Sequence, residues 1–482
     1  MAAPDQHSPQ GFLGNILKYS IATYLGFGIS GLALIVSGVL GPEKTAAPLT
    51  FMSATATLMN IGILGLDQSL LRFYAEPPSG RTGRQLFGFC LTISALVMTA
   101  AGLFFSLVCP DWLAGILSFQ AMGSGVVPLL FLNAFFYMWV RYLNVLLRLE
   151  GKVGLYTLET LLMQGCYNLF YLVAGFFTSD PYAFALVSVL SFGGVALVFG
   201  LRYRGVFREG RQAFTKPVAK QILPYGLALA PTQIMLYLNN TFSLAFLGNS
   251  LGTTVQGTFA FGVRLSQLVT TIQAGFSTFW GPFVYANYRD QQELIAKVQD
   301  YLCLLIFSFY CCLVAAEDIL FFIFPAYQGC LPVFPVLMMS PVFTILCEGT
   351  VYGISIARRP IFDTMGIAIS ALGNIGLCIL LVPKMGLMGA SLALAVSGGG
   401  MFLFRTIMGQ YYYRTILHPL RTATGFVLAI GVAAAGVFFW DRFLIKGVLC
   451  LAALVLYLIL YREQLKEAAG FLGQLTQARK SS

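Results

Sequence analysis

Arg264 is the residue whose type and position point most directly to chemistry. It lies about eleven residues into an apolar stretch that begins near Thr253 and ends near Pro282, so we expect its guanidinium close to the middle of a membrane. It is the only one of the 29 Lys and Arg residues that cannot be placed at a helix end or in a loop. A cation at that depth costs roughly 2.5–3.5 kcal/mol. A partner anion or an anionic substrate must compensate for this cost.

Small and polar residues share a helical face with Arg264. Steps of three and four residues along the stretch give Thr253, Gly257, Ala260, Gln267, Thr271, Gly275 and Thr278. The preceding stretch carries Gln233, Asn239, Asn240 and Ser243, and Gln273 follows Arg264. Such a stripe suits the wall of a water-filled cavity, because lipid penalises each polar group. The alternative is that Arg264 pairs with a carboxylate and the small residues allow close helix packing.

Glu348 is the acidic residue best placed to couple transport to an ion or a proton. It lies in the inner half of an apolar stretch, where a carboxylate could relay a proton or neutralise Arg264. A structural salt bridge, or a protonated acid held by hydrogen bonds, is the alternative. Lys18 lies near the start of the first apolar stretch, at its expected cytoplasmic end. By default it is a snorkelling anchor, and it has a functional role only if it points into a central cleft.

Three further acids lie within a turn or two of the expected cytoplasmic face, namely Asp67, Glu159 and Asp363. Solvation or local pairing is the expectation for all three. We expect Asp67 to pair with Arg72. We expect Asp363 to pair with Arg358 or Arg359.

The composition is that of a membrane protein. Hydrophobic residues make up 58% of the chain and charged residues 10%, whereas soluble domains carry about 25% charged residues. The mean hydropathy is +0.79. The apolar blocks are long and continuous, which argues against a β-barrel of short alternating segments. We therefore predict an all-α polytopic membrane protein.

Fourteen apolar stretches are long enough to span a membrane, since each span needs about 20 residues. They cover residues 16–39, 47–70, 84–108, 125–147, 153–177, 182–201, 221–247, 254–282, 302–324, 333–356, 361–382, 386–408, 422–440 and 443–461. With the N-terminus inside, 24 basic residues fall in cytoplasmic segments, and only Lys44, Lys384, Arg442 and Lys446 fall outside. This asymmetry predicts that both termini are cytoplasmic.

The longest cytoplasmic link, Arg202–Lys220, divides the first six spans from the rest. Segments 181–194 and 387–400 resemble each other at an offset of 206, and "VLG" at 39–41 precedes "FLG" at 246–248 by 207. Six spans per repeat give two lobes of the same orientation. We predict pseudo-symmetric six-helix lobes at 1–205 and 206–415, followed by two extra helices and a tail at 416–482.

Several classes of function find no support in the sequence. It has no P-loop, GxSxG or HExxH motif, and no acidic outer loop of the kind a glycosyltransferase or polymerase would need. The only histidines are His7 and His418, so we expect no metal site and no cofactor. The ten cysteines, among them Cys303, Cys311, Cys312, Cys378 and Cys450, read as small buried hydrophobes. The net charge of +10 comes from scattered basic residues at helix ends, and nucleic acid is not an expected partner.

Four segments carry a family resemblance: "GVLGPEKTAAPLTF" (38–51), "GLDQSLLRFYAE" (65–76), "VLLRLEGKVGLYTLETLL" (145–162) and "LLVPKMGLMGASLALAVS" (380–397). Through them the chain resembles the polysaccharide transporter family, the Wzx-like lipid-linked oligosaccharide flippases of the MOP exporter superfamily. The resemblance implies two six-helix lobes around a cationic cavity, in which Arg264 and Lys18 match basic positions. This chain has Asn240 and Thr241 where many relatives have an Asp-Arg pair, so a mechanism that uses that acid does not carry over.

The resemblance implies a flippase that moves an undecaprenyl-diphosphate-linked oligosaccharide across the bacterial inner membrane by alternating access. In that interpretation Arg264 receives the diphosphate, Lys18 and Arg72 add positive charge at the entry side, and Gln233, Asn239, Asn240, Gln267 and Gln273 contact sugars. The expected partners are the glycan substrate, membrane lipids, a polysaccharide polymerase and glycosyltransferases. The alternative function is a MATE-like multidrug or small-cation antiporter, which would need a membrane-embedded carboxylate.

Overall fold

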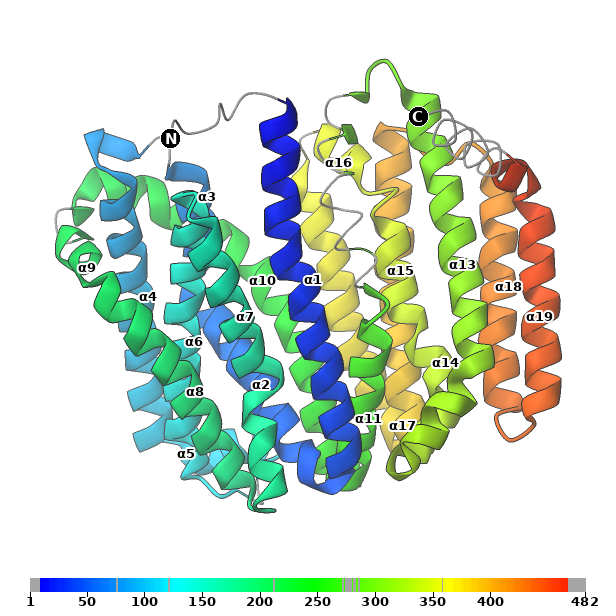
Figure 1. The fold of residues 1–482 in the computed structure, drawn as a ribbon, viewed down its shortest axis with the longest axis horizontal. Helices are drawn as coiled ribbons and strands as arrows, with labels where there is room; N and C mark the ends of the chain where they lie inside the picture. Colours follow the sequence, from blue (N-terminus) through cyan, green and yellow to red (C-terminus); the bar gives the residue numbers. More distant parts are fainter. Residues whose placement is uncertain are drawn as a thin grey trace, which may run out of the picture. The chain divides into compact units, whose positions relative to one another are not determined.

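The chain is helical throughout the part that is described. The structure is a computed structural model that describes residues 9–466 except 75–76, 120–121, 211–212, 271–272, 274–279, 281–282, 285–286 and 358. Among these residues there is no strand (Figure 1), and nine helices are long and apolar enough to cross a membrane. The predicted class, an all-α polytopic membrane protein, is confirmed. Each of the fourteen predicted spans falls on helical structure where its residues are described.

The chain divides between Phe261 and Gly262 into two compact units. The first unit includes α10 (Lys216–Leu251), because α10 packs against α2 (Pro42–Ile63) and α3 (Leu66–Phe73). The sequence-based division instead assigns this helix to the second lobe. The lobe boundaries at 205/206 and 415/416 therefore stay a prediction.

The core of the first unit is formed by α2, α6 and α10. The other helices of this unit are α1 (Pro9–Leu40), α4 (Gly83–Leu107), α5 (Pro110–Ile116), α6 (Val126–Leu149), α7 (Val153–Asn168), α8 (Pro181–Arg202) and α9 (Arg204–Gly210), with 3-10 turns η1 (Pro78–Gly80) and η2 (Phe170–Phe176). α2 has 78% of its apolar window buried, the largest share among the candidate spans of this unit. This burial explains why α2 tolerates polar residues: the Asn133 side chain donates to the Thr55 hydroxyl at 3.1 Å inside the protein rather than facing lipid.

The second unit is organised around two long helical elements. Its helices are the end of α11 (Thr253–Gln267), α13 (Gln292–Ile323), η4 (Pro325–Val333), α14 (Phe334–Leu337), α15 (Met339–Cys347), α16 (Tyr352–Ile356), α17 (Pro360–Tyr412), α18 (Pro419–Phe438) and α19 (Phe443–Leu460). α13 packs against α18 and α19, the two extra helices predicted at the end of the chain. α15 and α16 pack against α17.

α17 contains two of the predicted spans as the arms of a helical hairpin. The chain turns at Gly386, whose φ of 56° and ψ of −129° are accessible almost only to glycine. Across the hairpin Gly400 lies against Ile369 and Gly373 lies against Ser397, so the arms are antiparallel. The sequence placed this turn correctly, between residues 382 and 386.

The predicted span 333–356 is not one helix. α14, α15 and α16 share it, and turns separate them at Met338 and at 348–351. Pro335 lies in the first turn of α14 and Pro341 in the first turn of α15, where a missing backbone N–H is tolerated.

The cysteine prediction is confirmed for Cys303, Cys311, Cys378 and Cys450, which are buried. It is wrong for Cys312, which is exposed because its side of α13 is not covered by other described helices.

Candidate functional site

Arg264 lies in the last turn of α11 and is half-buried. The helix gives way to a turn directly afterwards: the Leu268 N–H donates to the Leu265 carbonyl at 3.3 Å, and the Val269 N–H to the Ser266 carbonyl at 3.2 Å. The predicted span is therefore interrupted one turn after the arginine, and most of residues 271–286 lie outside the described residues.

This position lowers the cost of burying the Arg264 charge. A cation in the last turn of a helix gains about 0.3–1 kcal/mol from the helix dipole. Placing a cation at mid-membrane costs roughly 2.5–3.5 kcal/mol. The dipole therefore offsets a minor part of the cost, and direct hydrogen bonds or ion pairs must supply the rest.

The polar stripe on α11 is not uniform. A Cβ on Gly257 would stand 2.2 Å from the Pro42 carbonyl oxygen, so this glycine permits backbone-to-backbone packing on α2. Ala260 is only 3% exposed. Near the other end Arg264 is half-buried and Gln267 is exposed. The packing interpretation is thus correct for the first part of the stripe, and a cavity wall remains a prediction for its last turn.

The other predicted binding residues are distributed over three helices. Gln233, Asn239 and Asn240 belong to α10. Gln233 and Asn239 are half-buried, whereas the side chain of Asn240 lies outside the described residues. Arg72 is exposed at the end of α3, and its guanidinium lies 5.6 Å from the centre of the Phe73 ring. Lys18 belongs to α1, but its side chain also lies outside the described residues.

Hydroxyl and amide groups join α10 and α11 to α2, which the sequence did not predict. The Thr241 hydroxyl bonds to those of Ser53 at 2.9 Å and Thr57 at 2.7 Å. The Gln256 amide donates to the Thr50 hydroxyl at 2.7 Å. Thr241 therefore forms neutral hydrogen bonds at a position where the resembled family often has a charge.

Two predicted site residues are brought together in the second unit. The Gln273 amide donates to a Glu348 carboxylate oxygen at 2.7 Å. Glu348 is half-buried and follows α15 in the turn that leads to α16, so it is at a helix break rather than inside a helix. A carboxylate at a break between helices has backbone groups and solvent within reach, which suits either proposed role of this residue.

Glu159 on α7 is a fully buried carboxylate whose burial the sequence did not predict. Its side chain has no exposed surface, and it accepts a hydrogen bond from the Asn144 amide at 2.5 Å. The same amide reaches the Thr160 hydroxyl at 2.8 Å. One neutral donor, the Asn144 amide, bonds to this carboxylate, and the nearby Arg141 pairs with Asp67 instead. The expectation of a solvated Glu159 is therefore wrong.

Two other local pairings are also corrected by the structure. Asp67 lies 3.6 Å from Arg141 of α6 rather than pairing with Arg72, because α3 packs on α6. Asp363 pairs with Arg405 at 2.5 Å across the α17 hairpin rather than with Arg359. Arg358, the other predicted partner, lies outside the described residues. Both partners come from a neighbouring helix or helical arm rather than from the adjacent turn.

Lys446 and Glu317 form a buried ion pair between α19 and α13. Both side chains are 0% exposed, and the ammonium lies 2.8 Å from the carboxylate. Asp318 provides a second carboxylate for the same ammonium. Lys446 lies in the first turn of α19 and its side chain is buried inside the second unit. Its placement on the outer side of the membrane stays a prediction.

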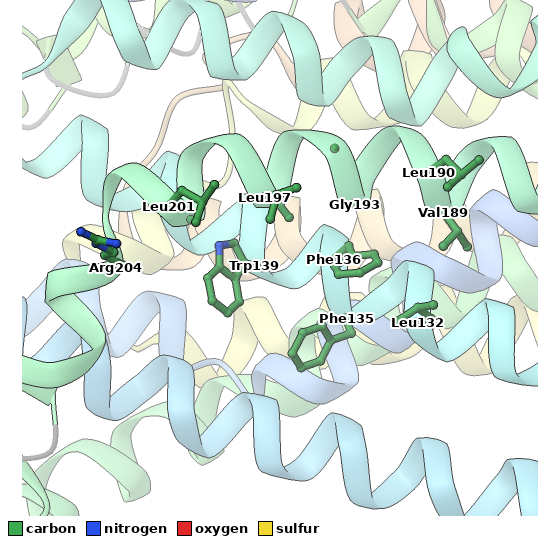
Figure 2. A pocket seen from close by; sticks show the side chains of 13 residues that line it. Leu132, Phe135, Phe136, Trp139, Val189, Leu190, Gly193, Leu197, Leu201 and Arg204 are labelled. Carbon is green, nitrogen blue, oxygen red and sulfur yellow. The ribbon is translucent and has the colours of Figure 1, made fainter.

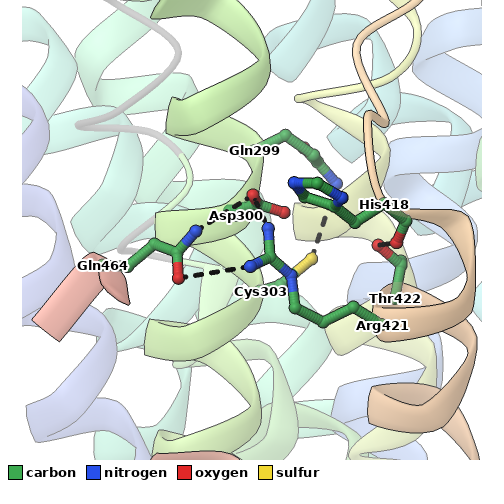
Figure 3. A network of polar contacts seen from close by, with 7 residues as sticks. All are labelled: Gln299, Asp300, Cys303, His418, Arg421, Thr422 and Gln464. Atoms are coloured by element: carbon green, nitrogen blue, oxygen red, sulfur yellow. Dashed lines mark hydrogen bonds and ion pairs between the residues drawn. The ribbon is translucent and has the colours of Figure 1, made fainter. Parts of the chain in front are cut away.

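A second charged network, centred on Asp300 of α13, also includes α18 (Figure 3). Arg421 of α18 forms an ion pair with Asp300, and the Gln464 amide donates to the same carboxylate at 3.2 Å. The Arg421 guanidinium also lies 5.2 Å from the centre of the Tyr461 ring. The Asp300 cluster therefore fixes α18 to α13, and the Lys446 cluster fixes α19 to α13.

Comparison with known proteins places the fold among transporters. No protein-family model matches the chain, and no curated protein matches it in sequence. An inward-facing structure of a MATE-family multidrug resistance transporter of the MOP superfamily matches with a TM-score of 0.58 and 16% identity, covering 86% of this chain and 99% of that chain. The lipid II flippase MurJ in an inward closed conformation has a TM-score of 0.58 at 13% identity, covering 93% and 99%. The MATE multidrug transporter DinF-BH has a TM-score of 0.55 at 16% identity, covering 85% and 97%.

Proposed function

We propose that this protein is a flippase that moves a lipid-linked oligosaccharide, carried on undecaprenyl diphosphate, across the cytoplasmic membrane by alternating access. The observation that carries the proposal is Arg264, a half-buried cation in the last turn of α11. A diphosphate cannot cross hydrocarbon unaided, because burying an unpaired charge is prohibitive. A guanidinium is well suited to receive it, since its planar donors bind phosphate oxygens in a bidentate manner.

The fold comparisons support a transporter and are compatible with this cargo. MurJ, a lipid II flippase, shares the fold over 93% of the chain, and the MATE transporter shares it over 86%. The match to the flippase covers the larger share of the chain, which supports the flippase interpretation. The prenyl tail needs no polar site, since it is as apolar as the surrounding lipid.

A MATE-like antiporter is the second candidate, and Glu159 is the observation that favours it. That function requires a carboxylate inside the membrane to bind a proton or a cation. Glu159 is fully buried and accepts its hydrogen bond from the neutral Asn144 amide, so it can change its charge without breaking an ion pair. We propose Glu159 as a further coupling candidate beside Glu348. A proton-coupled flippase would also use such a group.

Export in cells tests the flippase proposal through Arg264. Arg264→Ala should lower glycan export by about ten- to a hundredfold, because a hydrogen bond to a charged group is worth about 1.5–3 kcal/mol. Arg264→Lys should export glycan at a rate between those of the wild type and Arg264→Ala, because lysine keeps the charge but loses the bidentate donors. Arg442→Ala is the matched control, since Arg442 is exposed at the start of α19.

Unchanged export by Arg264→Ala at normal protein levels would remove this residue from the mechanism. Ethidium efflux distinguishes the two candidate functions. Efflux that depends on Glu159, without glycan export, would identify the antiporter.

A further inference from the structure

An apolar groove lies between α6 and α8 in the first unit, with a volume of about 750 Å³ (Figure 2). Glycines on α8 oppose aromatic rings on α6. A Cβ on Gly193 would stand 3.1 Å from the Phe136 ring, and one on Gly200 would stand 3.2 Å from the Trp139 ring. Gly194 faces open space. The groove thus has helix backbone along one side and aromatic rings along the other.

The groove ends at a cation. Leu190, Leu197 and Leu201 line it at helical spacing, and Arg204 of α9 lies at its end (Figure 2). The apolar part from Leu190 to Leu201 is about 16 Å long at 1.5 Å per residue. This length matches half of a hydrocarbon core of roughly 30 Å. The groove therefore has the depth of one leaflet, with Arg204 at the level of the headgroups.

A second, polar cavity of about 300 Å³ adjoins the groove in sequence: it is lined by Arg202, two positions before Arg204. Arg84, Lys152 and Arg202 line it, together with one carboxylate, that of Glu209. Glu150 already pairs with Arg84 at 2.7 Å and with Lys152 at 2.5 Å. Arg202 and Arg204 are exposed, and neither has an ion-pair or hydrogen-bond partner among the side chains that the structure describes. Two exposed guanidinium groups without a direct carboxylate partner among the described side chains therefore stand where the apolar groove ends, and basic residues outnumber the one carboxylate, Glu209, in the adjoining cavity.

We propose that this groove binds one anionic glycerophospholipid, with an acyl chain between α6 and α8 and the headgroup phosphate on Arg202 and Arg204. The occupant is an amphiphile because an apolar channel leads directly to cations. The bound lipid belongs to one leaflet, because the groove is as long as one leaflet is thick. The headgroup carries net negative charge because the two arginines lack carboxylate partners among the described side chains. The positive-inside prediction makes this the cytoplasmic leaflet, where anionic lipids are concentrated.

Lipid retention by the purified full-length protein tests the proposal. Native mass spectrometry would count bound phosphatidylglycerol and phosphatidylcholine after both are offered at equal concentration. The wild-type protein should retain phosphatidylglycerol preferentially. Each cation near a membrane surface strengthens binding to anionic lipid about fivefold, so Arg202→Gln/Arg204→Gln should lower phosphatidylglycerol affinity roughly twenty-five-fold. Gly194→Leu should lower retention of both lipids, because its side chain occupies the groove.

Arg148→Gln is the matched control, since Arg148 is an exposed cation at the end of α6 that does not line the groove. It should behave as the wild type. Equal retention of the two lipids by the wild-type protein would overturn the proposal. So would unchanged phosphatidylglycerol binding in both groove variants. Displacement of phosphatidylglycerol by undecaprenyl phosphate at equal concentration would also overturn it, because the groove would then belong to the substrate tail.

Discussion

Two helices of this protein bury carboxylates in opposite ways. On α7, Glu159 has no exposed surface and accepts its hydrogen bond from the neutral Asn144 amide. On α13, Glu317 has no exposed surface either, but it pairs with the equally buried Lys446. Burial is the same in both cases, and the partner differs.

The partner determines what each carboxylate can do. Charge at Glu317 is fixed by Lys446, because losing either charge would leave the other buried and unpaired. This pair and the Asp300–Arg421 pair therefore attach α18 and α19 to α13. Glu159 is not subject to that constraint, which is the reason for proposing it as a coupling residue. The first unit thus keeps a group suited to coupling, whereas these buried acids of the second unit serve its structure.

The largest effect is expected when the fixed pair is broken on one side. Lys446→Met should destabilise the protein by about 3–5 kcal/mol, because it leaves the Glu317 charge uncompensated. Lys446→Met/Glu317→Met should recover only part of this loss, because Asp318 still lacks its ammonium partner in the double variant. Thermal unfolding in detergent measures both variants. Equal stability of the single and double variants would show that Glu317 is not held as a charged group.

The same substitution at both acids sharpens the comparison. Glu317→Gln should cost about 1.5–3 kcal/mol, the worth of a hydrogen bond to a charged group. Glu159→Gln should change stability by about 1 kcal/mol or less, because its amide oxygen can still accept from Asn144. The unfolding temperatures of the two variants would be measured side by side. A larger loss of stability in Glu159→Gln than in Glu317→Gln would contradict the view that Glu317 is the structural carboxylate.

Transport assays distinguish a coupling role of Glu159 from a packing role. Glu159→Gln should retain protein level and substrate binding but lose the dependence of the transport rate on an imposed proton gradient, since an amide cannot exchange the proton. Glu317→Gln serves as the matched control, and its residual transport should keep the gradient dependence. A gradient response that survives in Glu159→Gln would leave Glu348 as the remaining candidate.

The smallest effect is expected outside the membrane, at Glu150. Partial burial raises the pKa of this carboxyl, but its bonds with Lys152 and Arg84 outweigh burial, so its pKa lies below the ordinary value. Its contribution to stability is then present above the unfolded-state pKa of about 4.3 and disappears as pH falls through the lower folded-state pKa. Glu150→Gln should therefore unfold slightly below the wild type at pH 7 and together with it at strongly acidic pH. A gap in unfolding temperature that persists at acidic pH would exclude this charge effect.

Hydropathy was sufficient to place the helices, because each span needs a long apolar run whatever its neighbours are. It also located the turn near Gly386, since Pro383 and Gly386 interrupt the pattern. The charge pairs could not be found in this way. Lys446 and Glu317 are 129 residues apart, and Lys446 near a helix start is equally consistent with an exposed anchor.

The sequence identified candidate residues of the site, such as Arg264, but not which side chains contact one another. Arg264 stands out because a single cation in an apolar run is conspicuous. Glu159 does not, since a glutamate near the predicted end of a span has the same sequence signature whether solvated or buried. Only the packing of α6 against α7, which brings Asn144 to Glu159, distinguishes the two states.

The most direct measurement is transbilayer movement of a fluorescent undecaprenyl-diphosphate glycan in proteoliposomes containing the purified protein. The wild type should move the glycan to the opposite leaflet faster than protein-free vesicles. Arg264→Ala should reduce this rate about tenfold or more, in line with the loss of a hydrogen bond to a charged group, and Arg442→Ala should leave it unchanged. Movement at the protein-free rate by the wild type, or equal rates for wild type and Arg264→Ala, would contradict the account.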